Sequence, residues 1–207
     1  MNPYSNLGAA ERRRLSKRIA VGWRRCLAVG LAVATTVGCD TPEPRVASAT
    51  AGLPEYSAEE SGIFDDILTP GTFGLPSVVP ATQDPQLGPR VHEADTVSPV
   101  RIATATTESL DGNDTSTLAF NPDGAPLAGH ALDGPVELRF SVGNPSAESI
   151  DRLGDSLVGK HLVLFLKRFD DQGEPKVHFH GDADTPELRN AIGREKTLDA
   201  LRGKAKN

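Results

Sequence analysis

Cysteine and aromatic residues are scarce in this sequence. Its 207 residues include two cysteines, one tryptophan, two tyrosines and seven phenylalanines. After Cys39 there is no tryptophan and the only tyrosine is Tyr56. Sites for sugars and single-stranded nucleic acids usually stack their ligands on exposed Trp or Tyr, so both classes are disfavoured. The chain also has no cysteine framework for a metal and no phosphate-binding glycine loop.

Long hydrophobic runs are missing as well. The longest charge-free stretch near the N-terminus, residues 26–38, has the sequence CLAVGLAVATTVG and is preceded by Arg24 and Arg25. A membrane-spanning helix needs about 20 apolar residues, so this run is too short. A basic flank, a short apolar core and small residues near a cleavage point are typical of a secretory signal peptide.

The end of this stretch, Thr36-Val37-Gly38-Cys39, resembles the lipobox of bacterial lipoproteins. In that family a small residue precedes a cysteine that receives a lipid; Thr36 departs from the usual leucine. The resemblance implies cleavage before Cys39, a signal peptide at 1–38, lipidation of Cys39 and an extracytoplasmic membrane anchor. The alternatives are an ordinary secreted protein or a retained anchor. Either Met1 or Val21 can be the start residue.

Removal of the signal makes the chain strongly acidic. Residues 39–207 hold 15 Lys and Arg against 27 Asp and Glu, a net charge of −12, whereas the full chain has −6. An acidic surface repels phosphate backbones, so nucleic acid is not expected as a partner. Because Cys26 leaves with the signal and Cys39 carries lipid, no disulfide is expected.

Residues 39–90 are predicted to be a largely disordered linker. Eight prolines fall within residues 40–90, and proline removes backbone donors and favours extended chain. The apolar patch SGIFDDIL at 61–68 either docks locally or forms a transient turn, and we favour the turn.

Residues 91–207 are predicted to form one small, mainly β (α+β) domain. We expect a sheet or barrel of about five strands with one or two short helices, one of them C-terminal. Residues 136–142 alternate apolar and polar side chains, and residues 162–166 are apolar throughout, which indicates a central strand covered on both faces. Helix starts are expected at Asn144-Pro145, Thr185-Pro186 and Thr197. The other strands are expected at 97–107, 117–120 and 176–180.

The order of strands over residues 94–181, with GKHLVLFL at 159–166, resembles small secreted β modules of the netrin-like, oligonucleotide/oligosaccharide-binding-fold type. Those modules usually carry disulfides, which this chain lacks. The resemblance implies a fold only.

Ser156 lies in Gly154-Asp155-Ser156-Leu157, which matches the motif of the GDSL esterases. That family needs a histidine base and a carboxylate, supplied by a closing Asp-x-x-His pair, and no histidine here has Asp three residues before it. Only 51 residues follow Ser156, too few for that domain. We interpret the motif as a coincidence.

His178 and His180 are the other candidates for chemistry. Strand residues two apart share a face, and two imidazoles at that spacing can hold one metal. Asp182, His161 and His130 are candidates for a third ligand. We favour the interpretation that Val177 and Phe179 face the core and both histidines are solvated, with no metal.

The expected function is therefore a lipid-anchored binding or envelope-interaction protein without enzymatic activity or cofactor. Its anchor would be the lipid on Cys39, and its partner an unidentified protein or small molecule. The alternative is a metal-binding or hydrolytic domain that uses His178 and His180, or Ser156.

Overall fold

The computed structural model describes residues 50–77, 79–110 and 113–205. The predicted signal peptide, Cys39 and residues 39–49 of the predicted linker lie outside this part. The described elements, in chain order, are α1 (Ala58–Ile63), β1 (Ile67–Leu68), η1 (Pro70–Phe73), η2 (Ala81–Gln83), α2 (Leu87–Glu93), β2 (Thr96–Leu110), β3 (Asn113–Pro122), β4 (Ala128–Gly129), β5 (Val136–Ser141), α3 (Pro145–Leu153), η3 (Gly154–Leu157), β6 (His161–Asp171), β7 (Glu174–Ala183) and α4 (Pro186–Ala205).

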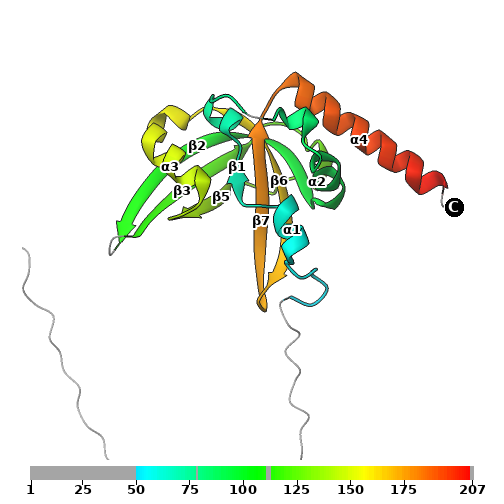
Figure 1. Cartoon of the computed structure of the whole chain (residues 1–207), viewed down its shortest axis with the longest axis horizontal. Helices are drawn as coiled ribbons and strands as arrows, with labels where there is room; N and C mark the ends of the chain where they lie inside the picture. The colour runs from blue at the N-terminus through cyan, green and yellow to red at the C-terminus, as the bar shows by residue number, and fades with distance from the viewer. Residues whose placement is uncertain (1–49, 78, 111–112, 206–207) are drawn as a thin grey trace, which may run out of the picture. The chain divides into compact units, whose positions relative to one another are not determined.

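The mainly β fold is as predicted. Seven strands form one sheet in the order β1-β7-β6-β2-β3-β5, and β4 pairs with the start of β2 (Figure 1). All pairings are antiparallel except that of β1 with β7. Since β1 and β5 end the sheet, it is not closed into a barrel. The two strands that the sequence did not reveal, β1 and β4, have only two residues each.

The central strand β6 confirms the interpretation of its apolar run, because hydrophobic residues cover both of its faces. Leu162, Leu164 and Leu166 contribute to one core cluster, which also contains Phe120, Phe140, Ile150 and Leu157. Val163 and Phe165 contribute to a second cluster with Phe64, Val91, Leu188 and Ile192. The first cluster lies beneath α3 and η3, and the second lies beneath α1, α2 and α4.

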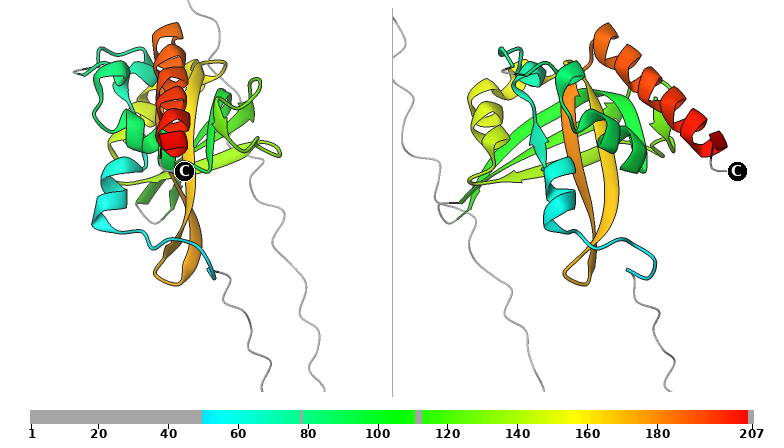
Figure 2. Two further views of the ribbon diagram at one scale, coloured as in Figure 1. Left: turned by 90° about the vertical axis from the view of Figure 1, so that its right-hand side faces the viewer. Right: turned by 45° about the vertical axis from the view of Figure 1, so that its right-hand side comes forward.

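Two predicted helix starts are confirmed and one is wrong. The side chain of Asn144 accepts a hydrogen bond from Ser146 N at the start of α3, and Thr185 Oγ1 accepts one from Leu188 N at the start of α4. No new helix begins at Thr197, because α4 runs without interruption from Pro186 to Ala205. Figures 1 and 2 show α4 extending away from the sheet.

The largest correction concerns the predicted linker. We call residues 53–93 the N-terminal wrap, because they carry α1 to α2 along the sheet and bury Phe64, Leu68, Phe73 and Leu87. The prediction of a transient turn at 61–68 is also wrong, because Phe64 and Leu68 of this patch are buried in the domain. Several of the prolines that suggested disorder occupy positions compatible with structure: Pro70 begins η1 and Pro80 precedes η2. The domain therefore begins about 40 residues before the predicted boundary at 91.

Candidate functional site

Strand β7 places three ionisable side chains on one face of the sheet. His178, His180 and Asp182 alternate along the strand, so they point the same way, and all three are buried. Phe179 points to the opposite face and packs edge-on against Phe140 with ring centroids 5.5 Å apart. The prediction that Phe179 faces the core is correct, whereas Val177 is 47% exposed.

The prediction that the two histidines are solvated is wrong. The N-terminal wrap covers their face, and the alternating pattern of a strand cannot show that a distant segment covers its second side. The covering residues are Asp65 and Asp66, which form the corner between α1 and β1. Together these side chains form a set that we call the His–Asp cluster: His178, His180, Asp65, Asp66 and Asp182.

Asp66 fixes the corner of the wrap to β7. Its φ of +55° lies in the left-handed region, which only a few residue types besides glycine adopt readily. Its backbone N donates to Phe179 O at 2.8 Å, and its Oδ1 accepts from Phe179 N at 3.0 Å. These bonds hold the unfavourable conformation in place.

The same corner is joined to helix α3. Asn144, which caps α3, donates from Nδ2 to Asp66 O at 2.8 Å. Two residues further on, Ser146 Oγ accepts from Leu68 N at 2.9 Å in a buried position. The N-terminus of α3 and the wrap are thus connected through buried polar groups.

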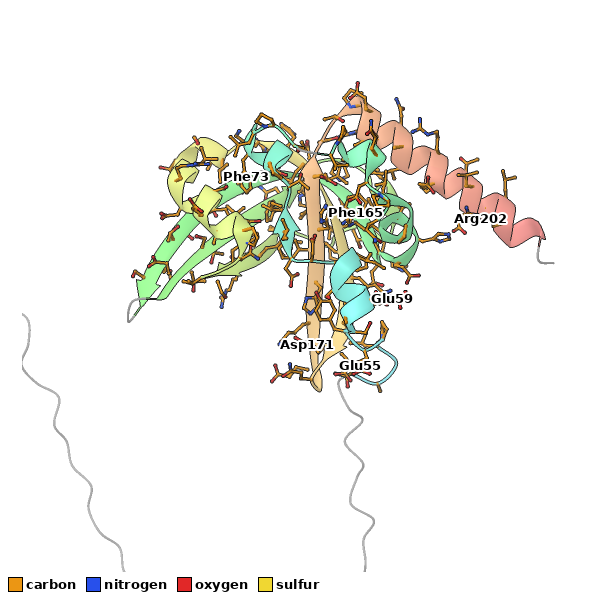
Figure 3. All side chains as sticks on the ribbon, in the orientation of Figure 1. Glu55, Glu59, Phe73, Phe165, Asp171 and Arg202 are labelled. Atoms are coloured by element: carbon orange, nitrogen blue, oxygen red, sulfur yellow. The ribbon has the colours of Figure 1, made fainter. Side chains whose placement is uncertain are left out.

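His178 lies between the wrap and the β6–β7 hairpin. Its Nδ1 is 2.8 Å from Asp66 Oδ2, and its Nε2 is 3.8 Å from Asp171 Oδ2. The Tyr56 ring stacks on the imidazole with a centroid distance of 3.5 Å and an angle of 8° between the planes. The Tyr56 hydroxyl donates to Phe64 O at 2.6 Å, which holds that ring in place. Figure 3 shows Asp171 at the hairpin end, with Glu55 close by.

His180 is placed between two carboxylates. Its Nδ1 is 2.8 Å from Asp65 Oδ1, and its Nε2 is 3.4 Å from Asp182 Oδ2 without forming a hydrogen bond. Burial alone would lower the pKa of His180, but Asp182 and Asp65 outweigh it and raise the pKa above its ordinary value. His180 is therefore the group in this cluster best suited to hold a proton.

Burial also affects two neighbouring acids. It raises the pKa of Asp66, and the hydrogen bond from His178 offsets this only in part. It raises the pKa of Tyr56 to about 12, with further contributions from Asp66 and Asp65. Both groups therefore favour their neutral forms more than they would in water.

Two buried cations, one in the wrap and one in β6, each pair with an acidic residue of the wrap. The buried guanidinium of Arg90 pairs with Asp84 and donates from Nε to Ile63 O at 2.7 Å. Lys167 Nζ is 2.6 Å from Glu93 Oε2 and lies over the Phe169 ring, 5.1 Å from its centroid. Arg90 thus joins parts of the wrap to one another, and the Lys167–Glu93 pair holds the wrap to β6.

The arrangement limits what the histidines can do. Both Nδ1 atoms are engaged by carboxylates, and both Nε2 atoms are buried without a hydrogen-bond partner. An Nδ1–carboxylate bond is also how a metal-binding histidine is oriented. Within the part of the chain that the structure describes, however, no three His, Cys, Asp or Glu side chains converge to hold a metal. Asp182 lies beside His180 alone.

The remaining predicted candidates lie apart from this cluster. His161 Nδ1 pairs with Asp123 at 2.7 Å in an exposed position, and His130 is exposed. Ser156 lies in η3, where its hydroxyl donates to Leu153 O at 2.7 Å. In that motif Gly154 ends α3 with a φ of +46° and Leu157 is fully buried, so the local fold accounts for both residues.

Sequence reasoning missed Tyr56, Asp65 and Asp66. The signal for the aspartates was their place in the apolar patch at 61–68, next to Phe64 and Leu68.

No family model, curated protein or solved structure matches this chain. Among the described residues, no helix has the length and apolarity required to cross a bilayer.

Proposed function

We propose that this chain is the precursor of an extracytoplasmic lipoprotein, anchored through Cys39, whose domain binds an envelope partner without catalysing a reaction. The anchor rests on the basic flank at Arg24 and Arg25, the short apolar core and the pair Gly38-Cys39. The partner is an unidentified protein or small molecule. The net charge of −12 after Cys39 disfavours nucleic acid.

One observation supports the non-enzymatic part of the proposal. Among the described residues, His178 and His180 are the histidines with two carboxylates nearby, and both of their Nε2 atoms are buried. A general base must reach the proton that it removes, and a metal ligand must reach its ion. In this geometry the His–Asp cluster fastens the wrap to β7. The wrap begins fourteen residues after Cys39, so the cluster strengthens the end of the domain nearest the anchor along the chain.

A second candidate function is metal binding at the same histidines. The observation in its favour is that carboxylates orient both rings through Nδ1, as they do in metal sites. It requires the wrap to move away from β7 and a third donor to approach. Hydrolysis at Ser156 has no such support.

The anchor is tested by metabolic labelling with a fatty acid in cells that express the full chain. Wild-type protein should incorporate label and remain with membranes, whereas Cys39→Ala should lose both properties, because only the cysteine thiol accepts the lipid. Cys26→Ala serves as the control and should label normally, since that residue leaves with the signal. Equal labelling of Cys39→Ala and wild type would refute the proposal.

A further inference from the structure

The charge of this chain is divided unevenly. Residues 39–187 carry 9 Lys and Arg against 25 Asp and Glu, a net charge of −16. Residues 188–207 carry six Lys and Arg against two acidic residues, a net charge of +4. Most of the second group lies in α4. An acidic body thus carries a basic helix.

The structure separates the two acidic residues of this region from its exposed cations. Asp199 Oδ1 is 2.9 Å from His92 Nε2 of α2. The Glu195 carboxylate also points toward α2, where it lies 3.2 Å from the position that a Cβ on Gly88 would occupy. Both acidic side chains of residues 193–202 therefore face α2, and that of Asp199 is 49% exposed beside its partner His92.

Two leucines lie among these cations. Leu198 and Leu201 are 44% and 58% exposed, and their spacing of three residues places them on one side of the helix. Arg194 lies on the same side, one turn before Leu198. We call the exposed residues Arg194, Leu198, Leu201 and Arg202 the basic end of α4. Lys196 lies on another side of the helix, where its Nζ donates to Leu127 O at 2.5 Å. Figure 3 labels Arg202 on the part of α4 that extends beyond the sheet.

Cations mixed with exposed leucines are typical of helices that lie on an anionic lipid surface. Each Lys or Arg near such a surface contributes about 1 kcal/mol. The leucines would insert between lipid headgroups and bury apolar surface there. A charged, acidic protein surface would not bury them in this way. Charge and apolar exposure together therefore favour a membrane over an acidic protein.

We propose that the basic end of α4 contacts the anionic headgroups of the membrane that holds the Cys39 anchor. This inference rests on the proposed lipoprotein function, because the anchor brings the domain to the bilayer. Ten residues lie between Cys39 and Thr50, and the eleven steps of chain that join them span at most roughly 40 Å. Repulsion of the acidic body and attraction of α4 then orient the domain on the surface.

Vesicle co-sedimentation tests this contact without the lipid. The mature chain from residue 39, carrying Cys39→Ser, is mixed with phosphatidylcholine vesicles or with vesicles that also contain phosphatidylglycerol. It should bind the anionic vesicles only, and added salt should weaken binding. Arg194→Gln/Arg202→Gln should reduce the affinity roughly 30-fold, and Leu198→Ser/Leu201→Ser should reduce it as well.

The matched control removes two exposed cations elsewhere, in Arg139→Gln/Arg168→Gln, and should bind like the parent. Equal losses in the two arginine variants, equal binding to neutral vesicles, or binding to polyglutamate but not to vesicles would overturn the proposal. Because no variant is lipidated, these results do not depend on whether Cys39 accepts lipid. Fatty-acid labelling of Cys39 likewise does not depend on α4, so the two proposals fail separately.

Discussion

At the scale of single residues, buried ionisable groups connect the stability of this domain to pH. Ionised groups lose hydration when they are buried, and only close pairing offsets that loss. In the His–Asp cluster the pairs join β7 to the wrap, at His178–Asp66 and His180–Asp65. Protonation of His180, whose pKa is raised by Asp182 and Asp65, therefore affects the attachment of the wrap.

Stability should fall as the pH rises past neutrality. The pKa of His180 is raised above its ordinary 6.5, so the folded state binds this proton more tightly than the unfolded state. Its contribution is fully present below about pH 6.5 and is lost as the pH rises through the folded pKa. Urea unfolding of the wild type should therefore give a higher free energy at about pH 5.5 than at about pH 8.

His180→Gln should reduce this pH dependence, whereas the exposed His130→Gln should retain it. An identical pH profile for wild type and His180→Gln would contradict the role assigned to His180.

Tyr56 offers a spectroscopic measurement of the same region. It is the only tyrosine after Cys39, so the ultraviolet absorbance of tyrosinate reports on it alone in the mature chain. Burial and the neighbouring carboxylates raise its pKa to about 12, so it should ionise well above the ordinary 10.0 in the folded protein. In denaturant the titration should return to about 10. Ionisation at 10 in the folded protein would show that the ring does not lie on His178.

Metal content tests the alternative use of the histidines. We expect no stoichiometric zinc in protein purified without chelators, because both Nδ1 atoms are engaged and both Nε2 atoms are buried. Elemental analysis measures this directly. One zinc per chain that disappears in both His178→Ala and His180→Ala would make metal binding the leading function.

At the scale of elements, the N-terminal wrap contributes to both hydrophobic cores. Leu68 and Phe73 belong to the core beneath α3, and Phe64 and Leu87 belong to the other. A wrap bound in this way is part of the folded domain and should unfold together with it.

Phe64→Ala should therefore destabilise the whole domain. Phe64 is fully buried and packs at the edge of Phe169, with ring centroids 5.7 Å apart. Loss of a buried phenylalanine costs about 3–5 kcal/mol in free energy of unfolding, measured with urea. The control is Leu75→Ala, a partly exposed residue of the same segment, which should cost less than about 1 kcal/mol. Equal, small losses for the two variants would restore the idea of a loose linker.

The sequence predicted the elements whose signals are local. Strands β5 and β6 have clear hydrophobic patterns, and α3 and α4 have capping residues followed by proline. The wrap could not be predicted in this way, because its attachment depends on partners more than 70 residues away, such as Ser146 for Leu68 and His178 for Asp66. Two-residue strands and a buried His–Asp pair leave no periodic pattern.

At the scale of the whole molecule, the proposal describes an acidic domain without disulfides, held close to a membrane. Among the described residues, which include neither cysteine, hydrophobic cores, hydrogen bonds and charge pairs stabilise the fold. The wrap follows the proposed attachment point closely along the chain, and its Asp65 and Asp66 join it to the histidines of β7. If Cys39 is the anchor, a force on the lipid is transmitted to the wrap before it reaches the rest of the domain.

The mass of the N-terminal peptide of protein purified from membranes tests this account most directly. If Cys39 is the anchor, the peptide should begin at Cys39 and carry a diacylglyceryl group on its sulfur, and residues 1–38 should be absent. An N-terminal peptide that begins elsewhere, or an unmodified Cys39, would contradict the account.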